Sequence, residues 1–147
     1  MLGPLEAFVN GVGQIVNELH STDLPADDPF VGEALDGIEV TYQRARFIHA
    51  VYSAAAAVGA GEPTQAWVEK ADAALDAART VVARRNGRLH DPNPEQLLTH
   101  ATNATTYPFG YLYYANQLCY WQRERAQLGP LIGEHVQIPS CFSVTLG

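Results

Sequence analysis

Apolar residues recur at helical spacing along most of the chain. Between Pro4 and His20 they lie three or four positions apart, at Leu5, Phe8, Val12, Ile15, Val16 and Leu19. This spacing places them on one face of a helix. Proline suits the first helical turn, because its missing N–H group has no partner there. The pattern predicts a first helix over Pro4 to His20, followed by a turn-rich loop over 21–30.

Residues 31–58 form the second predicted helix. Their apolar side chains lie on two sides of the helix, which is typical of a central and largely buried position. Asp27 or Asp28 is placed to cap its first turn. Gly37 is a candidate break within the helix, and the glycines and proline from position 59 to 63 end it.

The third predicted helix, over residues 63–86, has one apolar face, acidic residues near its start and arginines at its end, as the helix dipole favours. Gly87 fits the residue just past its end. Two further helices are predicted over 94–104 and over 106 to Gly129-Pro130. Residues 131–147 are apolar and β-prone without a helical period.

These elements predict an all-α fold, an antiparallel bundle of four to five helices with an extended C-terminal tail. Short connections favour antiparallel packing of neighbouring helices. At 147 residues the chain has the length of one domain. We expect residues 1–130 to form the helical bundle and residues 131–147 to form a tail that packs on the bundle or on a partner.

Charge is distributed unevenly along the chain. The first 43 residues hold eight acidic residues and no Lys or Arg, whereas the remainder holds nine basic and eight acidic residues, so that the total is −7. An acidic surface disfavours a nucleic-acid partner, because the phosphate backbone is itself negative. We expect the acidic third to pair, within the fold or across subunits, with the basic cluster Arg79, Arg84, Arg85, Arg88 and His90.

Several other function classes are disfavoured. No apolar run reaches the roughly 20 residues of a membrane helix, and the N-terminus lacks a basic secretory leader, so the expected location is the cytoplasm. Two cysteines are too few for a disulfide scaffold. Cys119 is interpreted as a small buried hydrophobe, and Cys141 has no neighbouring base to activate its thiol. No metal-binding, phosphate-binding or nucleophile motif is present, so neither a metal nor a cofactor is predicted.

The most unusual segment runs from Tyr107 to Trp121 and holds five of the seven tyrosines. Several of its aromatic residues share one helical face, which is typical of a core or an interface. Buried tyrosine hydroxyls also require polar partners, which is compatible with a polar-lined pocket. If a pocket exists, its predicted lining is His49, Tyr52, His100, Tyr107, Tyr111 and Tyr114.

Two functions follow from this pattern. The first is a non-catalytic interaction module, either a homo-oligomer or a small subunit of a larger assembly. The second is a small-molecule site for an apolar or aromatic ligand, in which His49 or His100 would transfer protons and tyrosines would orient the ligand. The sequence does not decide whether the protein is an enzyme.

Overall fold

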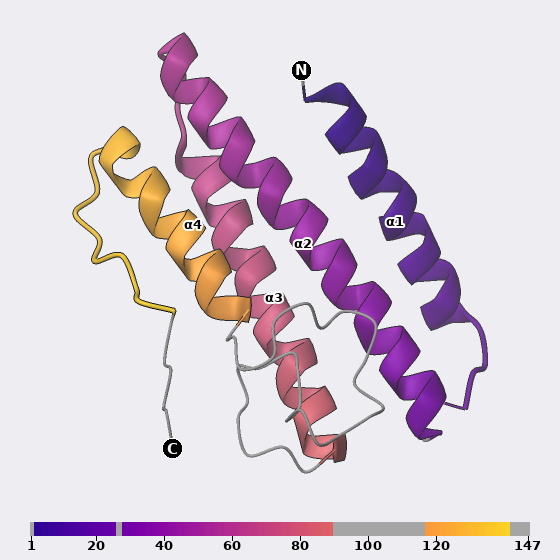
Figure 1. Ribbon diagram of the computed structural model, residues 1–147. Coiled ribbons are helices and arrows are strands. Elements are labelled where there is room, and N and C mark those ends of the chain that lie inside the picture. Colours follow the sequence, from indigo (N-terminus) through magenta and orange to yellow (C-terminus); the bar gives the residue numbers. More distant parts are fainter. Residues whose placement is uncertain (1, 26–27, 90–116, 142–147) are drawn as a thin grey trace, which may run out of the picture.

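The computed structural model describes residues 2–25, 28–89 and 117–141 (Figure 1). Within these ranges the chain forms four helices and no strand, in agreement with the predicted all-α class. The helices are α1 (Gly3–Ser21), α2 (Pro29–Ala60), α3 (Gln65–Leu89) and α4 (Gln117–Ile132). The predicted helix over 94–104 and the first part of the predicted helix over 106–129 lie outside the described residues.

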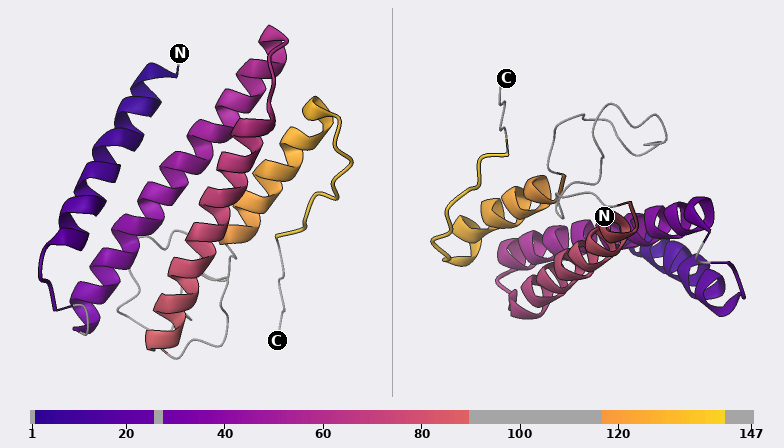
Figure 2. Two further views of the ribbon diagram at one scale, coloured as in Figure 1. Left: turned by 180° about the vertical axis from the view of Figure 1, so that it is seen from behind. Right: turned by 90° about the horizontal axis from the view of Figure 1, so that it is seen from below.

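The long helix α2 occupies the centre of the fold. It runs antiparallel to α1 and to α3, and α4 runs antiparallel to α3 (Figure 1). Both α1 and α3 pack along α2, and α4 packs against α2 and α3. In all three views α1 and α4 lie on opposite sides of α2 (Figures 1 and 2). The helices of the described residues therefore form an open arrangement in which α1 is an outer element.

Both ends of α2 are fixed by local hydrogen bonds. The Asp28 carboxylate accepts hydrogen bonds from the backbone N–H groups of Phe30 and Val31, as predicted for this N-cap. At the other end Gly61 adopts φ +70°, and the N–H of Glu62 reaches back to the carbonyl of Ala57 in a Schellman motif. The helix continues unbroken through the glycine at position 37, where a break was considered.

The C-terminal ends of α3 and α4 lie two or three residues beyond the predicted ends. Helix α3 continues past Gly87 to Leu89, because Arg88 in its last turn is held by carboxylates of α2. Helix α4 continues through Pro130 to Ile132 and ends at Gly133, which has φ +78°. The N–H of residue 134 donates to the carbonyl of residue 129 at 2.9 Å, so this end is again a Schellman motif.

The main core lies where α2, α3 and α4 meet. Alanines line much of the α2–α3 contact, and their small side chains let the two helices approach closely. The larger side chains come from the middle of α2 and the first turns of α4, where Phe47 stacks on Trp121 with ring centroids 5.6 Å apart. The buried members of this core are Phe47, Ala50, Ala71, Ala74, Leu75, Ala78, Val82, Leu118 and Trp121.

Charged side chains join the first half of α2 to the last turns of α3. Asp36 is buried and accepts from Arg84 Nε at 2.9 Å and from Arg88 Nη2 at 2.7 Å. Arg85 Nε donates to the Glu33 carboxylate at 2.8 Å. The predicted pairing of the acidic third with the basic cluster is therefore confirmed for these three arginines and occurs within one chain. Of the remaining members, Arg79 pairs with Asp76 on its own helix and His90 lies outside the described residues.

The ion pairs of Arg84 favour its charged form. Burial lowers the pKa of Arg84, but its hydrogen bonds to Glu39 and Asp36 outweigh that effect and raise the pKa above its ordinary value. Because the pKa of Arg84 is raised in the folded state, its stabilising effect is complete below the ordinary pKa of arginine. The effect is lost as the pH rises through the higher pKa of the folded state. The ion pairs that Arg84 forms with α2 therefore keep their positive partner throughout the physiological pH range.

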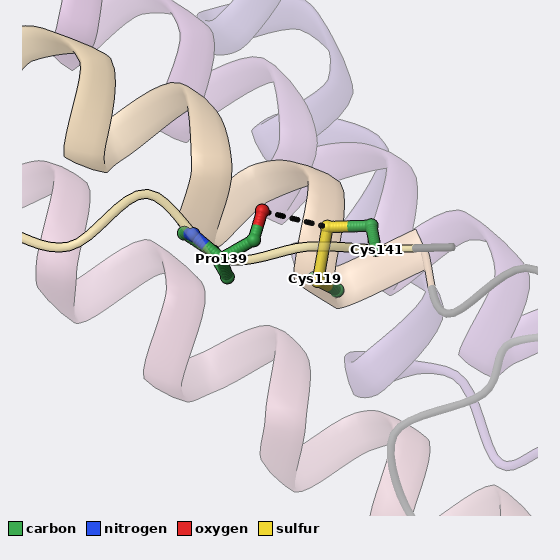
Figure 3. The surroundings of a disulfide bond; sticks show 3 residues. All are labelled: Cys119, Pro139 and Cys141. Carbon is green, nitrogen blue, oxygen red and sulfur yellow. Dashed lines mark hydrogen bonds between the residues drawn. A yellow bond between two sulfur atoms is a disulfide. The ribbon is translucent and has the colours of Figure 1, made fainter. Parts of the chain in front are cut away.

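A disulfide connects Cys119 near the start of α4 to Cys141 in the C-terminal segment (Figure 3). Their Cα atoms are 5.6 Å apart and the residues are separated by 22 positions. Residues 133–141 form neither helix nor strand and run back alongside α4, with Pro139 beside the bridge. The interpretation of Cys119 as a simple buried hydrophobe is wrong, because sequence spacing did not reveal that α4 and the tail return to the same point.

We expect Cys141→Ser to lower the free energy of unfolding by roughly 2–3 kcal/mol, because the closed loop of about 22 residues no longer restricts the unfolded chain. Thermal melts with and without dithiothreitol measure this effect. The reductant should destabilise the wild type and leave Cys141→Ser unchanged, with Ser140→Ala as the matched control. Alkylation of both cysteines in the unreduced protein, detected by intact mass, would contradict the assignment.

Candidate functional site

Helix α1 uses only part of its apolar stripe to bind the rest of the fold. Among the described helices it contacts α2 alone. Gly13 and Val16 are its buried residues, whereas Phe8 is 52% exposed and Ile15 is 50% exposed. Phe8, Val12 and Ile15, here named the α1 edge, therefore form an apolar strip at the border between the buried side and solvent.

The contact between α1 and α2 is close at one glycine. A Cβ atom at Gly13 would lie 3.0 Å from the ring of Tyr42, so only glycine lets this tyrosine pack directly on the helix backbone. His20 lies 3.7 Å from the carboxylate of Glu39 near the other end of the contact. These contacts fix how α1 is rotated on α2 and, with it, the direction in which the α1 edge faces.

A groove of about 470 Å³ runs between α2 and α4. Helical spacing places its apolar lining on facing sides of the two helices. Two large hydrophobic side chains at the groove are exposed, Tyr52 at 62% and Leu131 at 56%. The groove is lined by Arg44, Ile48, Val51, Tyr52, Ala55, Glu124, Gln127, Leu128 and Leu131.

An ion pair closes one end of this α2–α4 groove. Arg44 Nη2 donates to Glu124 Oε1 at 2.8 Å, and a second bond between the same groups makes the pair bidentate. The Arg44 guanidinium also lies 5.1 Å from the ring centroid of Trp121, within the range of a cation–π contact. Because the two charges neutralise each other, the groove has no unpaired charge with which to attract a charged ligand.

The structure separates the two predicted site residues that it describes. Tyr52 lies in the wall of the groove. His49 does not line the groove and packs edge-on against Trp67 of α3, with ring centroids 5.6 Å apart. His100, Tyr107, Tyr111 and Tyr114 lie outside the described residues.

Sequence reasoning did not identify the groove or the α1 edge as sites. For α1 the sequence did contain a signal. Its apolar stripe is wider than the surface that a single neighbouring helix can cover. For the groove, the sequence places apolar side chains on two sides of the second predicted helix, but the facing wall from α4 depends on how the helices align. Spacing along one helix does not show which neighbour lies opposite.

The basic cluster does not form an open anion site in the part of the chain that the structure describes. Its arginines there are engaged by carboxylates of α2 or α3. On α4, Arg125 is likewise held between Asp72 and Glu134. Burial lowers the pKa of Arg125, but hydrogen bonds to these two carboxylates outweigh it and raise the pKa.

Across residues 2–25, 28–89 and 117–141, no three His, Cys, Asp or Glu side chains gather into a group that could hold a metal ion. No helix in these ranges is long and apolar enough to cross a membrane.

Comparison with known proteins gives no relative for this chain. No protein-family model, no curated protein and no solved structure matches it.

Proposed function

We propose that this chain is a non-catalytic helical interaction module that associates with copies of itself, or serves as a small subunit of a larger assembly. The observation that carries this proposal is the α1 edge, an apolar strip on an outer helix that contacts only α2 among the described helices. The predicted bundle of four to five helices, with its extended C-terminal tail, is retained as the architecture of this module.

Covering the α1 edge would remove apolar surface from water. Full burial of a phenylalanine or isoleucine side chain is worth about 1.5–3 kcal/mol, and Phe8 and Ile15 are each about half exposed. Covering both would therefore contribute on the order of 2 kcal/mol. This is a fraction of the roughly 8 kcal/mol of a micromolar complex, so the other residues of the contact have to supply the remainder. Apolar strips flanked by polar residues are typical of protein interaction sites.

A small-molecule site is the second candidate, and the α2–α4 groove supports it. Its volume of about 470 Å³ falls within the roughly 300–1,000 Å³ of ligand pockets. The site would suit an apolar or aromatic ligand, with the Tyr52 hydroxyl as an orienting group. His49 packs outside the groove, which weakens its predicted role as a proton-transfer group.

The disulfide bears on where the protein works. The sequence led us to expect the cytoplasm, where disulfides are rare because thiols are kept reduced. A bridge between Cys119 and Cys141 is instead typical of proteins from oxidising compartments. We therefore propose an oxidising environment in place of the cytoplasm.

Self-association is testable by light scattering over a concentration series. The wild type is expected to form dimers or larger species at micromolar concentration, and Phe8→Glu together with Ile15→Glu should yield monomers, because each glutamate places a charge in the apolar contact. Gln14→Glu, on the exposed polar side of the same helix, adds one negative charge outside the α1 edge and should associate like the wild type. A wild-type protein that is monomeric at every concentration, with no partner captured from its source, would contradict the proposal.

A further inference from the structure

We propose that the α1 edge of one copy docks into the α2–α4 groove of a second copy, so that the copies associate head to tail. This inference rests on the proposed self-association and names the two surfaces that meet. Each copy would then present one edge and one groove.

The lengths of the two surfaces match. Phe8, Val12 and Ile15 stand at positions i, i+4 and i+7, which span about 10 Å along a helix. The apolar wall of the groove on α2 runs from Ile48 to Ala55, which is also seven positions. Anchors at i, i+4 and i+7 are those by which an amphipathic helix fills an apolar groove between other helices.

Charge favours this contact over a symmetric contact between two α1 helices. Helix α1 carries Glu6 and Glu18 and no lysine or arginine, so two copies facing each other would bring like charges together. In the groove, Arg44 and Glu124 neutralise each other. The acidic helix therefore meets a surface without net charge.

The position of α1 prevents it from filling the groove of its own chain. Helices α1 and α4 lie on opposite sides of α2 and make no contact with each other (Figures 1 and 2). An α1 helix that occupies the groove must therefore belong to another molecule. A contact between two different surfaces of identical chains leaves one of each free at the ends, so association continues into a ring or a filament.

The test uses two full-length variants. The edge variant carries Phe8→Glu and Ile15→Glu, and the groove variant carries Tyr52→Glu and Leu131→Glu, all at side chains exposed enough to leave folding intact. Each variant alone should be monomeric, with association weakened by about tenfold or more. An equimolar mixture should form a one-to-one dimer, because the edge variant keeps an intact groove and the groove variant keeps an intact edge.

The outcomes separate this inference from the proposed function. A mixture that stays monomeric, or a groove variant that associates like the wild type, overturns the head-to-tail contact while self-association through the α1 edge stands. A monomeric wild type overturns both the head-to-tail contact and the self-association on which it rests. A groove variant that melts at a lower temperature than the edge variant, when both are monomers, indicates that a segment of the same chain occupies the groove. Native mass spectrometry can also detect a small molecule bound to the wild type. If the groove variant no longer carries that molecule, the groove is a ligand site. Either of these two results rejects the docking of a second copy in the groove.

Discussion

Phe47→Ala is expected to lower the free energy of unfolding by about 4 kcal/mol. Phe47 is fully buried at the junction of α2, α3 and α4, where it stacks on Trp121. Removing its ring takes apolar area out of the core and leaves a cavity that the surrounding alanines are too small to fill. Because a domain is stabilised by only about 5–15 kcal/mol, the variant should unfold at a much lower urea concentration.

Phe8→Ala is the matched control for this prediction. It removes the same ring from the half-exposed α1 edge and should change the stability of the monomer by less than about 1 kcal/mol. Both variants are measured by urea unfolding at low protein concentration, so that association does not contribute. A loss below about 1 kcal/mol for Phe47→Ala would mean that the three helices do not enclose this side chain.

The second large effect is expected at Asp36, where substitution by alanine should cost about 3–4 kcal/mol. The carboxylate is 2% exposed and is shared by Arg84 and Arg88. Its removal leaves Arg84 paired with Glu39 alone and Arg88 with Glu33 alone. Each guanidinium then loses its buried partner, and breaking a buried ion pair costs more than the pair contributes. The partial exposure of Arg84 keeps the expected loss at the lower end of the range for buried pairs.

Asp76→Ala supplies the comparison for Asp36. Asp76 pairs with Arg79 on the surface of a single helix and should contribute no more than about 0.5 kcal/mol. Thermal unfolding at low and high salt distinguishes the two pairs, because solvent ions screen the exposed pair more strongly. Equal losses for the two variants would show that Asp36 is not buried between α2 and α3.

Local signals in the sequence were sufficient for much of the fold. The start of α2 follows from the Asp28 cap and its end from the turn at Gly61, because both depend on hydrogen bonds within a few residues. The pairing of the acidic third with the arginines also followed from the sequence, since opposite charges on neighbouring helices attract without exact alignment. Only the choice of partners, such as Asp36 for both Arg84 and Arg88, required the structure.

Local signals failed where a distant contact overrides them. Gly87 is a good helix terminator, yet α3 passes it because α2 holds the arginine that follows. The two cysteines appeared unrelated, since a separation of 22 positions gives no indication that the tail turns back beside α4. His49 and Tyr52 were assigned to one predicted pocket, but neighbouring helices divide them between different surroundings.

By itself, the sequence predicted the helices that the described residues form, placed the ends of α1 and α2 within two residues, and indicated which charges would attract across the fold. The tertiary structure decided which part of each apolar stripe is covered, and it brought the two cysteines and the two walls of the groove together. The physical reason is that periodicity and capping act within a few residues. Burial depends on what lies on the other side of a helix, and that is set by the packing of the whole chain.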